Sequence, residues 1–290
     1  MSGALKTRVI TAIILLLGLV AVAMFLPPLP FALIIGGIVM MAAWEWTGFI
    51  GLPDPVARLP YMLSILLALV GSWLLLGIEP DNADINRLAS ATVLTLGLLF
   101  WLLAFMLLRG YPDNTRKWNN RSGIALMGLM ALVPTWVGIV QLKYLMPEGW
   151  LVLGLIVMVA AVDVGAFFAG TAFGHTKLAE KLSPNKSWEG VWGGLFTCFC
   201  LGLLLTWGLH RFLMPLTGSQ MLALVLLSLT VTFFGVTGDL VESMLKRNRD
   251  IKDSGALLPG HGGLLDRVDG LMAVTPAFVL TVLLTVADIR

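Results

Sequence analysis

The segment between Gly238 and Gly270 combines carboxylates, cationic side chains and glycines in a chain that is otherwise apolar. Carboxylate oxygens suit hard divalent cations such as Mg²⁺, Lys and Arg neutralise phosphate charge, and glycine-rich turns let backbone amides crowd around a phosphate. The combination indicates a phosphoryl or nucleotidyl transfer centre, with a basic loop that only contacts lipid headgroups as the alternative. The charged residues are Asp239, Glu242, Lys246, Arg247, Arg249, Asp250, Lys252, Asp253, Asp266, Arg267 and Asp269.

Two helix ends are predicted to carry these groups. If the preceding apolar helix continues past the membrane surface, its polar residues share one face by i, i+3, i+4 and i+7 spacing. A Gly/Pro-rich turn follows, and the next helix is expected to begin near Leu264, with its amino-terminal dipole pointing towards the same place. The residues concerned are Asp239, Glu242, Ser243 and Lys246 on the first helix, Pro259, His261, Gly262 and Gly263 in the turn, and Asp266 and Asp269 on the second helix.

A second polar segment runs from Asp163 to Gly190. Asp163 lies within an apolar span, where an ionisable group is costly and usually faces a cavity or a partner. The stretch from Ser183 to Gly190 reads as a turn that caps the following helix, with Ser187 as the N-cap. Lys186 in this turn could bind a phosphate, although an ordinary capped loop explains the pattern equally well.

Glu45 is the remaining acid within an apolar span, and it lies between Trp44 and Trp46. Flanking tryptophans are typical of the membrane interface, so an interfacial position with a structural role is favoured. Cys198 and Cys200 form neither a disulfide framework nor a zinc pattern.

The composition identifies an integral membrane protein. Of the 290 residues, 58% are apolar and 12% are charged, against roughly 45–50% and about 25% in soluble domains. One core cannot hide that excess, because single cores stop growing near roughly 250–300 residues. A soluble enzyme, a disordered chain and a nucleic-acid binder are therefore excluded, and no nucleic-acid partner is expected.

The predicted fold is all-α and polytopic, since a bilayer core needs about 20 apolar residues per helix and the polar or Pro/Gly-rich breaks leave nine such segments. We expect residues 1–122 to form an N-terminal transmembrane region of about four spans, and residues 123–290 to form a catalytic region with polar loops 174–189 and 242–270. The first segment reads as a retained anchor rather than a cleaved signal. The segments are 9–26, 31–49, 61–78, 88–108, 123–145, 150–173, 190–212, 218–241 and 271–288.

The distribution of Lys and Arg predicts the orientation. With the amino terminus in the cytoplasm, fifteen of the 19 cationic residues fall inside and four, namely Arg87, Lys143, Arg211 and Arg290, fall outside. This is a strong positive-inside asymmetry. Both polar loops then face the cytoplasm, where a soluble anionic substrate and a lipid headgroup could meet.

The polar motifs resemble the signature of phosphatidate cytidylyltransferase, also called CDP-diacylglycerol synthase. The likeness runs through Ser243-Met-Leu-Lys246-Arg247, then Lys252-Asp253, then Pro259-Gly-His261-Gly262-Gly263-Leu-Leu-Asp266-Arg267-Val-Asp269. The stretches Asp163-Val-Gly165 and Ser183-Pro184-Asn-Lys186-Ser-Trp188-Glu189-Gly190 are similar to a second typical region of that family. Gly270 departs from the pattern, since many members carry Ser at this position.

The resemblance implies that CTP and phosphatidic acid give CDP-diacylglycerol and pyrophosphate. It also implies Mg²⁺, with a second cation such as K⁺, a homodimer in the cytoplasmic (inner) membrane, and a site that faces the cytoplasm.

On this hypothesis, Asp239, Asp266 and Asp269 bind metal, with Asp163 as a further ligand or a substrate-binding group. Lys246, Arg247, Lys252 and Arg267 hold the phosphates of both substrates, and His261, Gly262 and Gly263 cradle pyrophosphate. Asp253 is counted with the catalytic residues, and Lys186 and Ser243 with the substrate-binding ones.

Two other functions remain open from the residues. A CTP-dependent kinase acting on a polyprenol-type lipid would release CDP rather than pyrophosphate. An ion-coupled transporter would use Asp163, Asp239 and Glu45 as coupling groups, but the sequence shows no internal repeat of the kind common in transporters. A purely structural membrane protein fits poorly with the cost of placing these acids near lipid.

Overall fold

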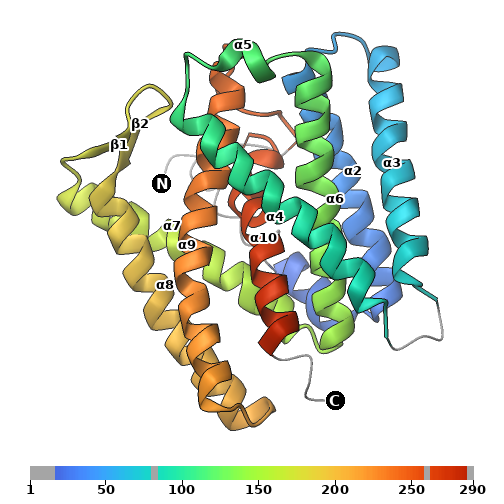
Figure 1. The fold of residues 1–290 in the computed structure, drawn as a ribbon, viewed down its shortest axis with the longest axis vertical. Helices are drawn as coiled ribbons and strands as arrows, with labels where there is room; N and C mark the ends of the chain where they lie inside the picture. Colours follow the sequence, from blue (N-terminus) through green and yellow to red (C-terminus); the bar gives the residue numbers. More distant parts are fainter. Residues whose placement is uncertain (1–16, 80–83, 258–261, 286–290) are drawn as a thin grey trace.

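The computed structural model describes residues 17–79, 84–257 and 262–285, which form a bundle of long helices with one small β-hairpin (Figure 1). Eight of the described helices are long and apolar enough to cross a membrane. The elements are α2 (Pro28–Ile50), α3 (Pro55–Leu76), α4 (Arg87–Arg109), α5 (Thr115–Trp118), α6 (Arg121–Leu145), α7 (Trp150–Phe173), β1 (Lys177–Ala179), β2 (Ser183–Ser187), α8 (Trp188–Gly208), the π-helical turn η1 (Leu209–Leu213), α9 (Gly218–Arg247) and α10 (Leu265–Thr285).

Side-chain caps and glycines define several helix ends. Asn86 and Asn120 accept hydrogen bonds from the first turns of α4 and α6, and Thr217 forms a capping box at the start of α9. These contacts satisfy amides that have no partner inside the helix. Gly51 and Gly77 adopt left-handed backbone angles that end α2 and α3, a conformation that glycine reaches without steric cost.

The all-α, polytopic prediction is confirmed, and α7 has the predicted bounds of 150–173. The prediction that the third span begins at residue 61 is wrong: α3 begins at Pro55, because proline is well tolerated in the first turn of a helix. Of the first predicted span, 9–26, the structure describes residues 17–25 as helix. The rest of that segment lies outside the described residues, so the count of nine spans stays a prediction.

The ends of the last two helices also differ from the predicted spans. α9 continues to Arg247 rather than ending at 241, and α10 begins at Leu265 rather than at 271. Both extensions carry charged residues, and one ion pair joins them, between Lys246 of α9 and Asp266 of α10. The start of α10 agrees with the separate expectation of a helix beginning near Leu264.

α6 lies at the centre of the bundle and packs against α2, α4 and α10, whereas α7 and α8 form a hairpin that packs against α9 (Figure 1). Glycines bring α7 and α8 close together. A Cβ added at Gly193 would lie 2.8 Å from the carbonyl oxygen of Gly165, and one added at Gly194 would lie 2.8 Å from that of Val162. Small residues at such a crossing let membrane helices approach closely.

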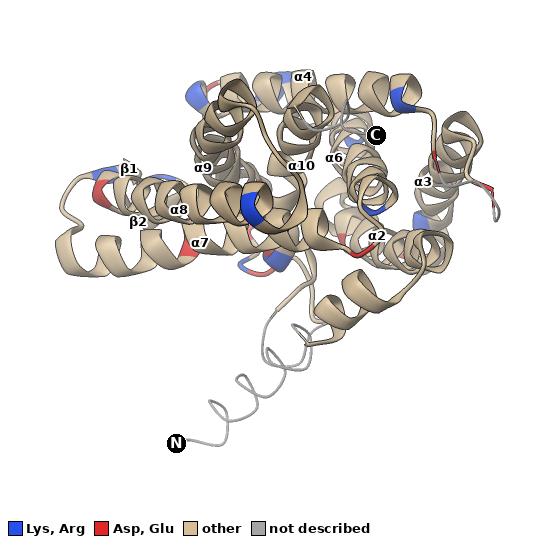
Figure 2. Cartoon of the chain, turned by 90° about the horizontal axis from the view of Figure 1, so that it is seen from below, with Lys and Arg blue, Asp and Glu red and all other residues tan. Residues whose placement is uncertain are grey.

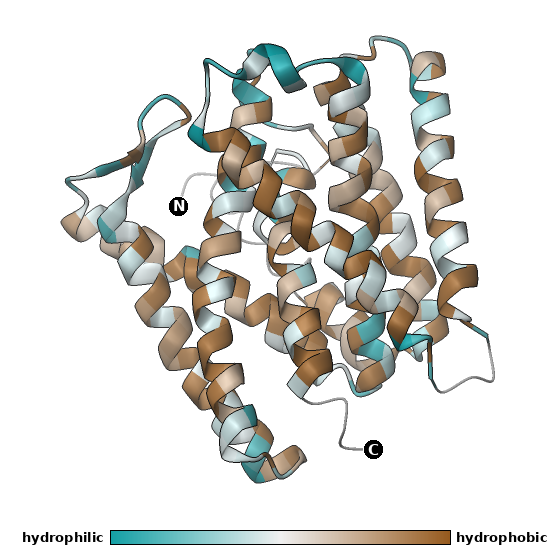
Figure 3. Ribbon diagram, in the orientation of Figure 1, coloured by the Kyte–Doolittle hydropathy of each residue, from teal (hydrophilic) through white to brown (hydrophobic). Residues whose placement is uncertain are grey.

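The middle of the bundle is apolar and its ends are polar (Figure 3). Charged residues gather mainly near helix ends and in the connections (Figure 2). Two contacts join distant segments at one end of the bundle. Arg249, just after α9, donates through Nε to the carbonyl of Phe49 near the end of α2 at 2.6 Å, and Arg247 donates through Nε to that of Leu182 in the β-hairpin at 3.2 Å. The segments that the charge count assigned to one side therefore meet in the structure, while the compartment that they face stays a prediction.

Candidate active site

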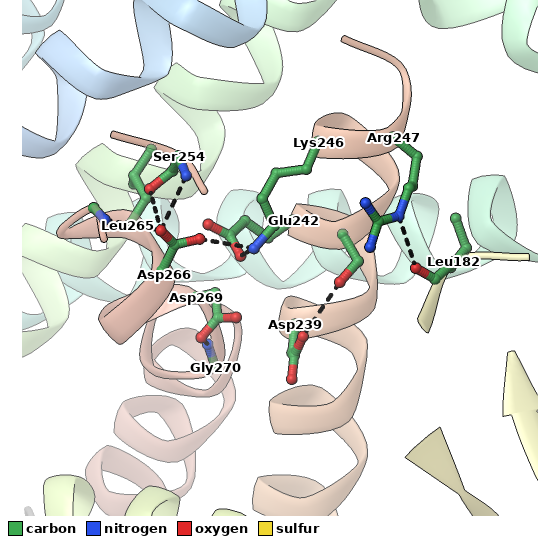
Figure 4. Close-up of polar contacts among 12 residues, drawn as sticks. Leu182, Asp239, Glu242, Lys246, Arg247, Ser254, Leu265, Asp266, Asp269 and Gly270 are labelled. Atoms are coloured by element: carbon green, nitrogen blue, oxygen red, sulfur yellow. Dashed lines mark hydrogen bonds and ion pairs between the residues drawn. The ribbon is translucent and has the colours of Figure 1, made fainter. Parts of the chain in front are cut away.

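The carboxyl-terminal end of α9 presents a row of polar side chains. Ser243 Oγ lies 3.4 Å from Asp239 Oδ1, and Lys246 Nζ donates to Glu242 Oε2 at 2.6 Å. The expected alignment of these four residues on one helix face is therefore confirmed, and Figure 4 shows Asp239, Glu242 and Lys246 on it. Glu242 is 3% exposed and its Oε1 has no hydrogen-bond partner among the described residues.

Asp266, in the first turn of α10, joins this row to the preceding loop. Its Oδ1 accepts a hydrogen bond from Lys246 Nζ at 2.7 Å. Its Oδ2 accepts from Ser254 N and Ser254 Oγ, both at 3.0 Å, and from Gly263 N at 2.9 Å. Both oxygens are therefore engaged, and the carboxylate holds Lys246 on one side and the loop on the other (Figure 4).

Asp269 lies one turn further along α10 and faces α9. The two helices touch there, since a Cβ added at Gly238 would contact the carbonyl oxygen of Asp269. Asp269 Oδ1 accepts from Gly270 N at 2.7 Å, and the carboxylate interacts electrostatically with Asp239, Asp163 and Lys186. Four groups from α7, β2, α9 and α10 thus share one electrostatic environment.

Lys186 supplies the cation of this group. It forms an ion pair with Asp239, and both side chains are partly exposed, at 26% and 37%. Lys186 lies on strand β2, so the prediction of a turn is wrong for residues 183–187, which pair with β1. Ser187 ends this strand, and its Oγ accepts from Gly190 N at 3.2 Å. The prediction that Ser187 caps α8 is therefore confirmed. Asp163, on α7, interacts electrostatically with both Asp239 and Lys186.

The other predicted site residues surround this cluster. Arg247, Lys252, Asp253 and Arg267 are exposed, and Arg247 reaches the β-hairpin rather than the acids. Among the described residues, Lys252 forms no hydrogen bond or ion pair.

The glycine turn before α10 is described only in part, since His261 lies outside the described residues. Gly262 adopts a left-handed φ of 81°, and a Cβ added there would lie 3.0 Å from Asp266 Oδ2. Gly263 donates its amide to the same oxygen. The turn therefore closes around Asp266.

Glu45 is buried inside the protein, whereas its predicted position at the membrane interface stays a prediction. It is 5% exposed, and its Oε2 accepts hydrogen bonds from Ser254 Oγ at 3.3 Å and from Leu265 N at 2.9 Å. The neighbouring Trp46 is also buried and donates to the carbonyl of Ile124 at 2.9 Å. No periodicity predicts this contact with the loop, because it joins residues about two hundred positions apart; the only signal was an acid inside an apolar span.

The donor set determines what cation the cluster could bind. In the described part of the chain, no three His, Cys, Asp or Glu side chains are arranged as a closed metal site. Asp239 and Asp269 nevertheless offer carboxylate oxygens from adjacent helices (Figure 4). Mg²⁺ is commonly held by one or two carboxylates together with substrate phosphates. The residues therefore fit an Mg²⁺ ion that arrives with a phosphate-bearing substrate.

The fold and the cluster define a polytopic α-helical membrane protein with an ion-paired polar centre at one end of its bundle. The sequence matches the Cytidylyltransferase family over residues 6–285, and the chain belongs to that family.

Two relatives are similar along nearly their whole lengths. The chain is 40% identical over 274 residues to the phosphatidate cytidylyltransferase of Pseudomonas aeruginosa, covering 94% of this chain and 95% of the relative. It is 35% identical over 285 residues to the enzyme of the same name from Haemophilus influenzae, covering 94% and 97%. The family predicted from the polar motifs is confirmed.

Proposed function

We propose that this chain transfers the cytidylyl group of CTP to phosphatidic acid, which yields CDP-diacylglycerol and pyrophosphate. The observation that carries the proposal is the alternation of cations and carboxylates where β2, α9 and α10 meet: Lys186 pairs with Asp239, and Lys246 pairs with Asp266. The family and the printed names of its relatives supply the substrates. The cluster supplies the charge pattern that two phosphate-bearing substrates require.

The reaction needs no covalent intermediate with the enzyme. A phosphate oxygen of phosphatidic acid attacks the α-phosphorus of CTP, a new P–O bond forms, and the bond to the β-phosphate breaks to release pyrophosphate. The main barrier is the approach of two polyanions, which positioned cations lower. Lys186 and Lys246 are held at the two sides of the cluster by carboxylates, so their ammonium groups are positioned before the substrates arrive.

The remaining predicted cations complete the proposed phosphate site. The exposed Arg247, Lys252 and Arg267 would hold the triphosphate and the lipid phosphate. The turn at Gly262 and Gly263 would contact the departing pyrophosphate through its backbone.

Asp239 and Asp269 would hold Mg²⁺ together with phosphate oxygens, and Asp163 would stand behind them as a further ligand or an orienting group. A second cation such as K⁺ is part of the same proposal. When bound, Mg²⁺ polarises the phosphorus under attack and neutralises charge that develops on the leaving group. Asp266 is proposed to act mainly by holding Lys246, since both its oxygens already accept hydrogen bonds.

The experiment that tests the function follows label from CTP into lipid. Protein in mixed micelles receives phosphatidic acid, Mg²⁺ and CTP that carries label in either the cytidine or the γ-phosphate. We expect cytidine label in the lipid and one pyrophosphate per product, with activity lost in EDTA and restored by Mg²⁺. Transfer of γ-label to a lipid alcohol with release of CDP would identify a kinase. Solute uptake by liposomes without CTP turnover would identify a transporter.

The proposed location is the cytoplasmic membrane, with the cluster facing the cytoplasm; the positive-inside count supports this. Asn185 is exposed beside Lys186, so Asn185→Cys in a background without Cys198 and Cys200 provides a reporter. An impermeant maleimide should label it from the cytoplasmic side only. The proposed homodimer rests on the family resemblance, and light scattering of the detergent-solubilised protein tests it.

A further inference from the structure

Glu45 connects the amino-terminal helices to the loop that precedes α10. It lies on α2, it is 5% exposed, and its two hydrogen-bond donors, Ser254 Oγ and Leu265 N, both belong to the segment around Asp266. The proposed transfer reaction gives this carboxylate no contact with either substrate.

The carboxylate acts as a cap that another helix supplies to α10. Leu265 is the first residue of α10, so its amide has no acceptor inside the helix. Glu45 Oε2 accepts from it at 2.9 Å, at the helix end where negative charge is stabilised. The position of α10, and hence of Asp266 and Asp269 on it, is therefore tied to α2.

Two glycines make room for this carboxylate. A Cβ added at Gly263 would lie 2.7 Å from Glu45 Oε2, and one added at Gly255 would contact Glu45 Oε1. The backbone of the loop therefore packs directly onto the acid. A second contact between the same segments reinforces the docking, since Arg249 donates to the carbonyl of Phe49 near the end of α2.

Packing alone does not account for an acid at this position. Burying a carboxylate costs several kcal/mol unless a cation and hydrogen bonds compensate it. Glu45 forms no ion pair with a described Lys or Arg, and its Oε1 has no hydrogen-bond partner among the described residues. An apolar side chain of similar volume would fill the space at lower cost.

Ser254 links Glu45 to the ionic cluster. Its hydroxyl oxygen lies 3.3 Å from Glu45 Oε2 and 3.0 Å from Asp266 Oδ2. Because a hydroxyl has one proton to donate, the two carboxylates share this donor. Asp266 in turn holds Lys246. A displacement of Glu45 would therefore move Ser254, Asp266 and the ammonium of Lys246 together.

We propose that Glu45 is a positioning residue for the cytidylyl transfer: from α2 it fixes Ser254 and the first turn of α10, so that Asp266 holds Lys246 where the phosphates bind. This inference rests on the proposed function. It also makes the amino-terminal helices part of the apparatus that aligns the site.

The test compares four variants of the full-length protein in detergent. Glu45→Ala removes both hydrogen bonds, and Glu45→Asp withdraws the carboxylate by one methylene. Glu45→Gln can place its amide oxygen where Oε2 lies and still accept from both Leu265 N and Ser254 Oγ. Thr47→Val is the matched control, because Thr47 is buried on the same helix and its hydroxyl donates within that helix, to the carbonyl of Trp44.

The readouts are kcat per folded enzyme, the KM for CTP, and amide hydrogen exchange of peptides that contain Leu265. Misplacement by about 1 Å can lower a rate about 100-fold, so we expect kcat to fall about that much in Glu45→Ala. Glu45→Asp should show a smaller loss, Glu45→Gln should recover most of the activity, and Thr47→Val should match wild type. Exchange at Leu265 should accelerate in Glu45→Ala without any substrate present.

A double-mutant cycle with Ser254→Ala identifies the route. If Glu45 acts through Ser254, the two substitutions are non-additive in kcat. Additive effects, or kcat within about threefold of wild type in folded Glu45→Ala and Glu45→Asp, would overturn the proposal. If Glu45→Ala does not fold, Glu45→Asp and Glu45→Gln decide the question. Failure of the proposed function would appear instead in wild type, as absence of lipid-linked cytidine, and the exchange measurement at Leu265 would still test the positioning.

Discussion

Replacing Asp266 with Asn tests the centre of the ionic cluster with a change of almost no volume. The wild-type carboxylate accepts from Lys246 Nζ at 2.7 Å through Oδ1, and from Ser254 and Gly263 through Oδ2. An amide has one acceptor oxygen. If that oxygen keeps the loop contacts, the NH₂ group faces the ammonium of Lys246, and two donors oppose each other.

The expected magnitude follows from the bond that is lost. A hydrogen bond to a charged group contributes about 1.5–3 kcal/mol, a factor of about 10 to 150 if it is expressed entirely in the rate. Lys246 remains attached to Glu242 at 2.6 Å, so it shifts rather than leaves. We expect kcat of Asp266→Asn to fall about 10- to 150-fold, while the helices stay folded.

The assay measures CDP-diacylglycerol formation at saturating CTP, phosphatidic acid and Mg²⁺, alongside a thermal midpoint in the same detergent. Asp250→Asn is the matched control, since Asp250 is an exposed acid in the same region and its φ of 55° is one that Asn also tolerates. Near-normal kcat in Asp266→Asn, or an equal loss in Asp250→Asn, would refute the reasoning.

Three further substitutions probe the surroundings of the cluster. Lys186→Met removes the ion pair with Asp239 and a proposed phosphate ligand worth about 1.5–3 kcal/mol. The KM for CTP should therefore rise at least about tenfold, as measured by steady-state kinetics. Gly263→Ala forces a Cβ against Ser254 Oγ, and the displaced loop should lower kcat about 100-fold in the same assay. Ser187→Ala removes the N-cap of α8 and should cost about 0.5–2 kcal/mol of stability, which a lower thermal midpoint would report.

Each of these changes has a control elsewhere in the chain. Lys181→Met alters an exposed lysine of the same hairpin, and Gly48→Ala adds a Cβ that meets nothing within 4 Å. Thr95→Ala removes a hydroxyl that bonds only within α4. The interpretation fails wherever a control reproduces the loss seen in its partner variant.

Local sequence patterns predicted those parts of the site that depend on neighbouring residues. The spacing of Asp239, Glu242, Ser243 and Lys246 placed them on one helix face, and the structure agrees. Ser187 was recognisable as a cap because capping requires only a short polar side chain beside the first turn of a helix. The span bounds were less accurate, because hydropathy cannot assign polar residues such as those after 241 to a helix.

The contacts of Glu45 could not be predicted in this way. Its flanking tryptophans favoured a depth near the interface, which says nothing of its partners, and the structure shows contacts with Ser254 and Leu265. Such a contact depends on how α2 packs beside α10, which no single helix encodes. The same limit applies to Asp266: sequence suggested a metal ligand, whereas the structure shows both oxygens occupied by donors from α9 and from the loop.

The length of α9 has a consequence for how a charged centre can exist in this bundle. Thirty residues at 1.5 Å each extend about 45 Å, whereas the hydrocarbon layer is about 30 Å thick. If α9 starts at one surface of the hydrocarbon layer, about ten of its residues extend beyond the other surface. These are residues 238–247, which include Asp239, Glu242 and Lys246. These turns would project into the headgroup region. A nucleotide bound there would stay hydrated, while the acyl chains of a lipid substrate would stay in the hydrocarbon layer.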